Sequence, residues 1–304
     1  MIGEAAHTRA ESHLARGYTL ALTGTFVWSA TGPMIAYLLA STALLPVTLA
    51  AWRDLLTAGV LAVVLAVFAR HRLRLPRRHW GFLAAYGATL ALTNATWTWS
   101  VQLNGAAIST VLVYTSPALV ALGSRWLFGE KLSRVIGVSL VLSIVGVALV
   151  AGLYDPLTLA ANPAGTILGI GSGALFAAYS LFGKGAARRG LHATTIMVYT
   201  FGVAGALLFL AAGRDAVPTI PPSAWLGLLI LAAGPTLGGY GLFTASLAYL
   251  PAANASLITV LEPALTACLA WVFLGETMTP LQLLGGALIV SSVVALALGE
   301  RRSE

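Results

Sequence analysis

The chain is 304 residues long, and 58% of its residues are hydrophobic whereas only 9% are charged. Soluble domains carry about 25% charged residues, so this composition excludes ordinary soluble enzymes and disordered proteins. The net charge of +7 does not indicate a nucleic-acid partner, because the basic residues are spread over several loops rather than gathered in one patch. We therefore expect a polytopic membrane protein, in which the single Cys268 forms no internal disulfide.

A helix needs roughly 20 mostly apolar residues to cross the hydrocarbon core of a bilayer. Residues 1–17 are too polar for this and are expected to form a cytoplasmic tail, without the features of a secretory signal peptide. The stretches that satisfy the requirement are, in chain order, 18–39, 44–69, 80–102, 106–128, 132–153, 164–185, 194–212, 224–247, 252–273 and 280–299. The predicted fold class is an all-α membrane protein with ten transmembrane helices and short connections.

The positions of Lys and Arg predict the orientation of these spans. If the N-terminus is cytoplasmic, only Arg214 lies in a loop on the opposite side, and Arg53 lies inside a span. All the other Lys and Arg residues are then in cytoplasmic segments, as the positive-inside rule requires. Both termini are expected in the cytoplasm.

An internal repeat relates the two halves of the chain. The segment 116–133 aligns without gaps to 262–279, and Pro117, Gly129 and Glu130 recur as Pro263, Gly275 and Glu276. Five spans in each half insert the second half upside down relative to the first. Inverted repeats of this kind are typical of secondary transporters, whose substrate lies near the bilayer midplane between the halves.

In these residues the chain resembles the EamA-type branch of the drug/metabolite transporter superfamily. The matching pattern is a proline, then Gly-Glu at the end of that helix, then an early glycine in the next helix, which is Gly137 in one half and Gly285 in the other. Trp28 also resembles a feature of the opening helix of this family. The resemblance covers all ten spans, as five-helix units at 18–153 and 164–299.

This resemblance implies a multi-pass protein of the bacterial inner membrane that exports small metabolites by alternating access. Amino acids are common substrates, and the aromatic-rich composition favours exporters of aromatic or large neutral amino acids. Three alternatives stay open: a multidrug or lipophilic-cation exporter of the same fold, a membrane-embedded lipid-modifying enzyme, and a passive channel.

Three charged residues lie away from the ends of the predicted spans, where a charge is costly and therefore indicates function or pairing. We expect Glu262 to bind a substrate ammonium group or a proton, and Arg53 to bind a substrate carboxylate. Asp54 is a second candidate for proton coupling. Because consecutive helical residues point about 100° apart, Arg53 and Asp54 are not expected to pair with each other.

Aromatic residues away from the span ends are candidates for the substrate pocket, since a ring offers an apolar face and one polar end. Plain helix packing is the alternative for each. The aromatic candidates are Trp28, Trp97, Tyr114, Tyr179 and Tyr240. Asn94 is a further candidate, because its amide lies on the same helical face as Trp97.

Prolines inside or near the spans predict kinks or broken helices. We expect hinges at Pro33, Pro117, Pro235 and Pro263. The two Gly-Glu pairs are expected to be structural, with Gly ending one helix and Glu favouring the start of the next.

No metal or cofactor is expected. Every histidine lies in a predicted tail or loop, and the chain has no Walker-type nucleotide motif. The expected partners are a small-molecule substrate and the lipid bilayer. One chain contains both halves, so a monomer is sufficient.

Overall fold

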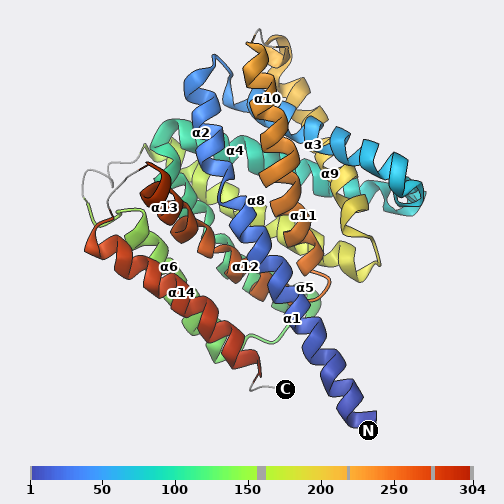
Figure 1. The fold of residues 1–304 in the computed structure, drawn as a ribbon, viewed down its shortest axis with the longest axis vertical. Coiled ribbons are helices and arrows are strands. Elements are labelled where there is room, and N and C mark those ends of the chain that lie inside the picture. Colours follow the sequence, from blue (N-terminus) through green and yellow to red (C-terminus); the bar gives the residue numbers. More distant parts are fainter. Residues whose placement is uncertain (1, 156–161, 218–219, 275–277, 302–304) are drawn as a thin grey trace.

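The computed structural model describes residues 2–155, 162–217, 220–274 and 278–301 (Figure 1). The predicted roles of Gly275 and Glu276 therefore lie outside the described residues. The first half contains α1 (Ile2–Trp28), α2 (Thr31–Ser41), α3 (Pro46–Phe68), η1 (Arg70–Leu73), η2 (Arg77–His79), α4 (Trp80–Val113), α5 (Ser116–Phe128) and α6 (Arg134–Val150). The second half contains α8 (Pro163–Arg188), α9 (Ala193–Ala212), η3 (Gly213–Ala216), α10 (Pro222–Leu231), η4 (Ala232–Thr236), α11 (Leu237–Ser246), α12 (Ala252–Thr259), α13 (Leu261–Leu274) and α14 (Pro280–Arg301).

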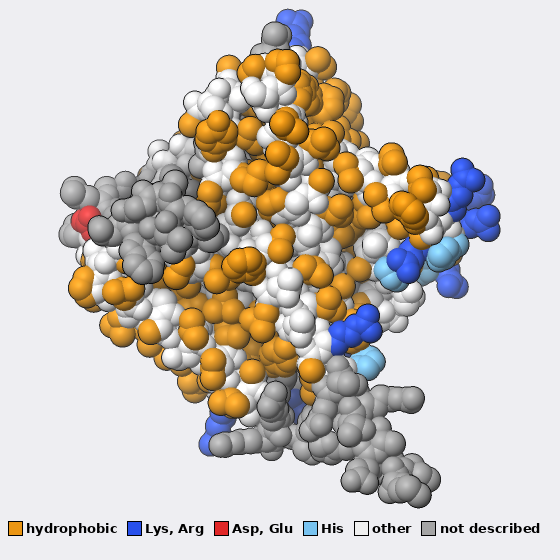
Figure 2. Space-filling view, in the orientation of Figure 1, with side chains coloured by type: hydrophobic (Ala, Val, Ile, Leu, Met, Phe, Trp, Pro, Cys, Tyr) orange, Lys and Arg blue, Asp and Glu red, His pale blue; other side chains and the backbone are white. Residues whose placement is uncertain are grey.

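The surface of the molecule is that of a protein surrounded by lipid. Figure 2 shows hydrophobic side chains over most of one face, with Lys and Arg gathered at its edge beside the end of α3. Among the described residues, six segments are by themselves long and apolar enough to cross a membrane: Pro46–Phe68, Val111–Phe128, Pro163–Arg188, Ala193–Ala216, Pro222–Ser246 and Pro280–Leu298. The other predicted spans correspond to α1 together with α2, to the N-terminal part of α4, to α6, and to α12 together with α13.

The helix α4 turns back on itself between the third and fourth predicted spans. The side-chain oxygens of Ser100 and Ser109 are 2.8 Å apart, whereas residues nine apart in a straight helix are separated by about 13.5 Å. The helix α8 packs along both arms, since a Cβ on Gly169 would meet Ser100 of the first arm and Leu112 of the second. The expected loop between the two spans is thus reduced to a tight reversal.

Two spans are interrupted at positions that the repeat relates. The helices α4 and α5 are separated at Tyr114 and Thr115, and α12 and α13 are separated at Val260. Tyr114 and Val260 are 146 residues apart, which is the spacing of the repeat. A third interruption divides α1 from α2 at Ser29 and Ala30.

The helix contacts also have the symmetry of two inverted halves. The third span contacts the sixth (α4 with α8), as the eighth contacts the first (α11 with α1). The second span contacts its own counterpart (α3 with α9), and so does the fifth (α6 with α14). Exchanging the halves leaves this set of contacts unchanged, which is the arrangement expected of an inverted five-helix repeat.

Small residues allow the fifth and tenth spans to approach closely. A Cβ on Gly146 would lie 2.7 Å from the Gly285 carbonyl oxygen, and a Cβ on Gly285 would lie 2.6 Å from the Gly146 carbonyl oxygen. The expected counterpart Gly137 has no such neighbour, since nothing lies within 4 Å of a Cβ built there. Close backbone packing between α6 and α14 therefore uses Gly146 and Gly285.

The first Gly-Glu pair is structural, but its glutamate serves a helix other than the expected one. Gly129 ends α5 in the left-handed region, with φ of 69°. The Glu130 carboxylate accepts a hydrogen bond from the backbone N–H of Ala252, at the start of α12, with an Oε2–N distance of 3.1 Å. Because α5 packs against α12, Glu130 at the end of α5 stabilises the N-terminus of α12 instead of that of α6.

Candidate functional site

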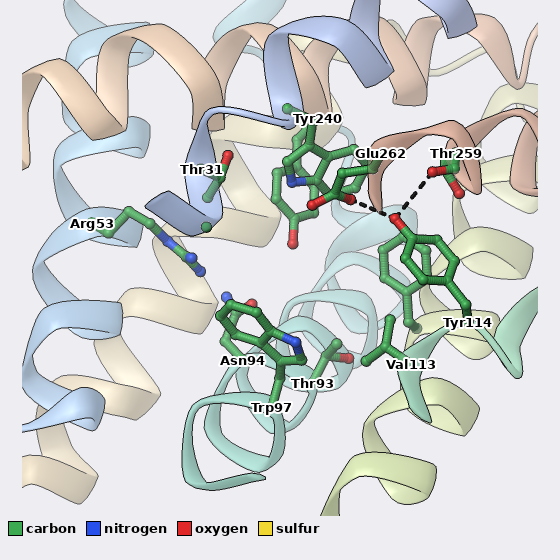
Figure 3. A pocket seen from close by; sticks show the side chains of 13 residues that line it. Thr31, Arg53, Thr93, Asn94, Trp97, Val113, Tyr114, Tyr240, Thr259 and Glu262 are labelled. Carbon is green, nitrogen blue, oxygen red and sulfur yellow. Dashed lines mark hydrogen bonds between the residues drawn. The ribbon is translucent and has the colours of Figure 1, made fainter. Parts of the chain in front are cut away.

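A cavity of about 80 Å³ lies between the two halves, and both contribute side chains to it (Figure 3). The lining residues are Trp28, Thr31, Gly32, Arg53, Thr93, Asn94, Trp97, Val113, Tyr114, Phe176, Tyr240, Thr259 and Glu262. Those up to Tyr114 come from the first half and the others from the second. The cavity is bordered by the interruptions between α1 and α2, α4 and α5, and α12 and α13. Broken helices place polar backbone groups at membrane depth, where they are tolerated beside a cavity.

One wall of the cavity is aromatic. The Trp28 ring lies with its centroid 4.2 Å from that of Tyr240 and 5.8 Å from that of Phe176. Trp28 comes from the first half, and the other two rings come from α11 and α8 of the second half. The rings form an apolar surface that joins the halves beside the cavity.

A second wall joins the two broken spans through one hydroxyl group. The Tyr114 Oη is 2.6 Å from Glu262 Oε2 and 3.0 Å from the carbonyl oxygen of Thr259. In an uninterrupted helix the N–H of residue 263 would bond to that carbonyl, but Pro263 has no N–H. The proline thus leaves a carbonyl without its helical partner, and a tyrosine of the other half donates to it.

The single phenolic proton cannot serve both acceptors fully. When Glu262 is ionised, the Tyr114 hydroxyl donates to the carboxylate, and the Thr259 carbonyl loses part of its hydrogen bond. When Glu262 is protonated, its own O–H can donate to Tyr114, whose proton is then available to Thr259. The contact between the halves therefore depends on the protonation of Glu262.

The opposite side of the cavity carries the cation Arg53, held by Asp54. Arg53 Nε and Nη2 lie 3.1 and 3.0 Å from Asp54 Oδ1. The expectation that these consecutive residues do not pair is wrong. Their side chains leave the helix about 100° apart, but the arginine side chain is long enough to bend toward Asp54. Asp54 Oδ2 also accepts a hydrogen bond from Asn94 Nδ2 at 2.7 Å.

The structure brings most of the predicted pocket residues together. Those that line the cavity are Trp28, Arg53, Asn94, Trp97, Tyr114, Tyr240 and Glu262. Tyr179 does not line it: its ring packs behind the wall, 5.6 Å from Tyr240 and 5.9 Å from Phe176 between centroids. On α8 it is Phe176 that lines the cavity, and Tyr179 lies about 4.5 Å further along the helix axis. Asp54 is fully buried and does not line the cavity either.

Six lining residues were not predicted from the sequence: Thr31, Gly32, Thr93, Val113, Phe176 and Thr259. Small, apolar and hydroxyl residues are common throughout the spans of this chain, so their types do not distinguish them. Two signals were available: Thr259 is the residue whose carbonyl Pro263 leaves unpaired, and Phe176 lies one helical turn before Tyr179.

All four predicted hinge prolines lie at or close to irregular backbone. Pro235 lies within the π-helical turn η4, and Pro117 is the second residue of α5, just after the interruption. Pro33 and Pro263 lie three residues beyond Ala30 and Val260. Movement at these points stays a prediction.

Comparisons with known proteins agree with this architecture. The sequence profile of the EamA-like transporter family matches the chain twice, over residues 15–152 and 163–298. The threonine/homoserine exporter RhtA of Escherichia coli is 31% identical over 239 residues, which are 76% of each chain. YwfM, an uncharacterized transporter of Bacillus subtilis, is 26% identical over 289 residues, which are 93% of this chain and 94% of that one.

One solved crystal structure superposes on this chain with a TM-score of 0.74. The match covers 95% of this chain and 99% of the other, at 20% sequence identity. At this identity the likeness shows a shared fold alone.

Proposed function

Because this chain belongs to the EamA-like transporter family, we propose that it exports small neutral α-amino acids across the cell membrane by alternating access. The observation that carries the proposal is the placement of Arg53 and Glu262 on opposite sides of one cavity (Figure 3). An α-amino acid carries a carboxylate and an ammonium group on the same carbon. In the proposed complex Arg53 binds the carboxylate and Glu262 binds the ammonium group.

Two further observations support a small substrate. Sites for drug-sized ligands have volumes of roughly 300–1,000 Å³, and this cavity of about 80 Å³ is much smaller. The relative RhtA is described as an exporter of threonine and homoserine, both of which are small. The aromatic or large neutral substrate expected from composition rests on no comparable observation, although the rings of Trp28, Phe176 and Tyr240 would suit it.

A lipophilic cation is the second candidate substrate, and the aromatic wall favours it. A cation over the face of an aromatic ring gains about 0.5–2 kcal/mol, and Glu262 adds an acidic partner. Arg53 opposes this candidate because it places a positive charge in the same cavity.

Several features of the transport cycle are part of the proposal. In the proposed cycle both termini are cytoplasmic, which the distribution of Lys and Arg supports. The cycle alternates two conformations of the inverted halves about the prolines near the broken helices. One chain supplies the whole cavity, and the driving force is a substrate gradient, exchange or protons through Glu262.

Expression in a bacterial strain that is hypersensitive to toxic solutes tests the substrate class. The panel has three arms: analogues of small neutral amino acids, analogues of aromatic amino acids, and cationic dyes. We expect protection against the first arm, with a shift in inhibitory concentration of about tenfold relative to an empty vector, and none against the dyes. Tracer efflux of L-threonine from preloaded cells provides a measurement independent of growth.

The other arms give outcomes that contradict the proposal. Protection against aromatic analogues alone would return the substrate to the class expected from composition. Protection against dyes alone would identify a cation exporter. Asp215→Asn is the matched control for a substitution of an acidic residue, and it should protect like the parent because Asp215 is an exposed acid outside the cavity.

A further inference from the structure

The fully buried Asp54 is bonded to two residues that line the cavity, although it does not line the cavity itself. Its Oδ1 pairs with Arg53 at 3.0–3.1 Å, and its Oδ2 accepts from Asn94 at 2.7 Å. Asp54 is 0% exposed and Arg53 is 3% exposed. A carboxylate removed from water in this way is retained only where paired and hydrogen-bonded groups compensate it.

These bonds determine which atoms the two neighbours present to the cavity. An ionised carboxylate only accepts hydrogen bonds, so Asn94 turns its amide nitrogen toward Asp54. The carbonyl oxygen of Asn94 then remains as an acceptor for a ligand in the cavity. Nε of Arg53 donates to Asp54, whereas the buried Nη2 lies 3.0 Å from the same oxygen and makes no hydrogen bond with any described residue, so the Nη1 and Nη2 donors remain for a ligand. Without Asp54, both the amide and the guanidinium group could rotate.

We propose that Asp54 is a positioning residue that sets the specificity of the cavity for a carboxylate next to a hydrogen-bond donor. Held from behind by Asp54, Arg53 faces the substrate carboxylate, and Asn94 accepts from the ammonium or hydroxyl group of the same molecule. This inference rests on the proposed transport of α-amino acids and adds a residue that never touches the substrate.

The experiment compares transport of L-threonine with that of L-threoninamide, which lacks the carboxylate, in proteoliposomes that contain the full-length protein. The parent is expected to prefer threonine by about tenfold to a hundredfold, the range for hydrogen bonds to charged groups. In Asp54→Asn we expect this preference to fall to about threefold or less and the KM for threonine to rise about tenfold, with a smaller change in kcat. A purely structural role would reduce the amount of folded protein without changing the selectivity ratio.

Two further variants keep the test decisive if Asp54→Asn does not fold. Asp54→Glu keeps the charge but moves the carboxylate, and we expect it to lower the preference for threonine. The exchange D54N with N94D keeps both residue types and the net charge, yet it places the carboxylate in the cavity beside Arg53. We expect the exchange to leave the preference lost, because that carboxylate competes with the substrate for the guanidinium group.

Each remaining outcome overturns the inference in a recognisable way. Parental selectivity in both Asp54→Glu and Asp54→Asn would show that Asp54 does not set the specificity. Its restoration by the exchange would show that Asp54 only balances the charge of Arg53. The proposed function would survive both results. A parent that transports no α-amino acid would contradict the proposed function and this inference together. Asp215→Asn is again the matched control for an Asp-to-Asn change outside the site.

Discussion

If protons drive transport through Glu262, the Glu262→Gln variant is expected to lose accumulation of substrate in proteoliposomes with an imposed proton gradient, while exchange continues. Glutamine has nearly the shape of a protonated glutamate and still reaches Tyr114, whose hydroxyl lies 2.6 Å from Glu262 Oε2 in the parent. It cannot take up or release a proton. We expect gradient-driven accumulation to fall at least about tenfold, whereas exchange continues with weaker affinity because the amide oxygen accepts from the ammonium group without a charge.

Glu262→Ala separates proton coupling from substrate binding. Alanine removes the partner of the substrate ammonium group, and loss of a hydrogen bond between charged groups costs about 1.5–3 kcal/mol, or roughly 10- to 150-fold in affinity. Exchange and accumulation should therefore both decline in this variant. If Glu262→Gln behaves like the parent at every pH, Glu262 does not couple transport to protons.

Gly285→Val is expected to destabilise the protein, whereas the same change at the neighbouring Gly286 is expected to be neutral. A Cβ at position 285 would lie 2.6 Å from the carbonyl oxygen of Gly146 and 2.9 Å from the backbone nitrogen of Val150. Backbone atoms cannot move aside as a side chain can, so α6 and α14 must separate. Nothing lies within 4 Å of a Cβ at position 286, and both substitutions carry the same intrinsic helix preference.

Thermal unfolding in detergent, followed by size-exclusion chromatography, measures the difference. Overpacking costs about 1–3 kcal/mol or more, so Gly285→Val should lower the apparent melting temperature by about 5 °C or more. Gly286→Val should stay within about 2 °C of the parent. Equal melting temperatures for the two variants would contradict the close contact between the fifth and tenth spans.

Much of the fold is predictable because the bilayer imposes it. The length of an apolar stretch and the cost of a buried charge are properties of lipid, and the repeat adds the inverted symmetry. The finer backbone is set by tertiary contacts that no local pattern encodes. The tight reversal within α4 and the binding of Glu130 to the start of α12 depend on the packing of distant segments. Likewise, Gly285 packs closely against Gly146, a residue that the repeat pattern does not include.

The candidate site was predictable where chemistry marks a residue as unusual in lipid. Arg53, Asn94 and Glu262 stand out because polar groups at membrane depth need partners. Phe176 and Val113 carry no such mark, since identical residue types face lipid elsewhere. The pairing of Arg53 with Asp54 was missed because helical angles describe where side chains begin, and a long arginine ends several ångströms away.

The central claim is that one cavity between two inverted halves is exposed to each side of the membrane in turn. Counterflow tests it most directly: purified protein is reconstituted into vesicles loaded with unlabelled L-threonine, and a trace of labelled L-threonine is added outside. We predict that the label transiently accumulates above its equilibrium level inside the loaded vesicles, because internal substrate speeds the return of the protein to the outward-facing conformation. In empty vesicles the label should enter more slowly and should not accumulate above equilibrium. Entry of label at the same rate with and without internal threonine would contradict alternating access and indicate a channel.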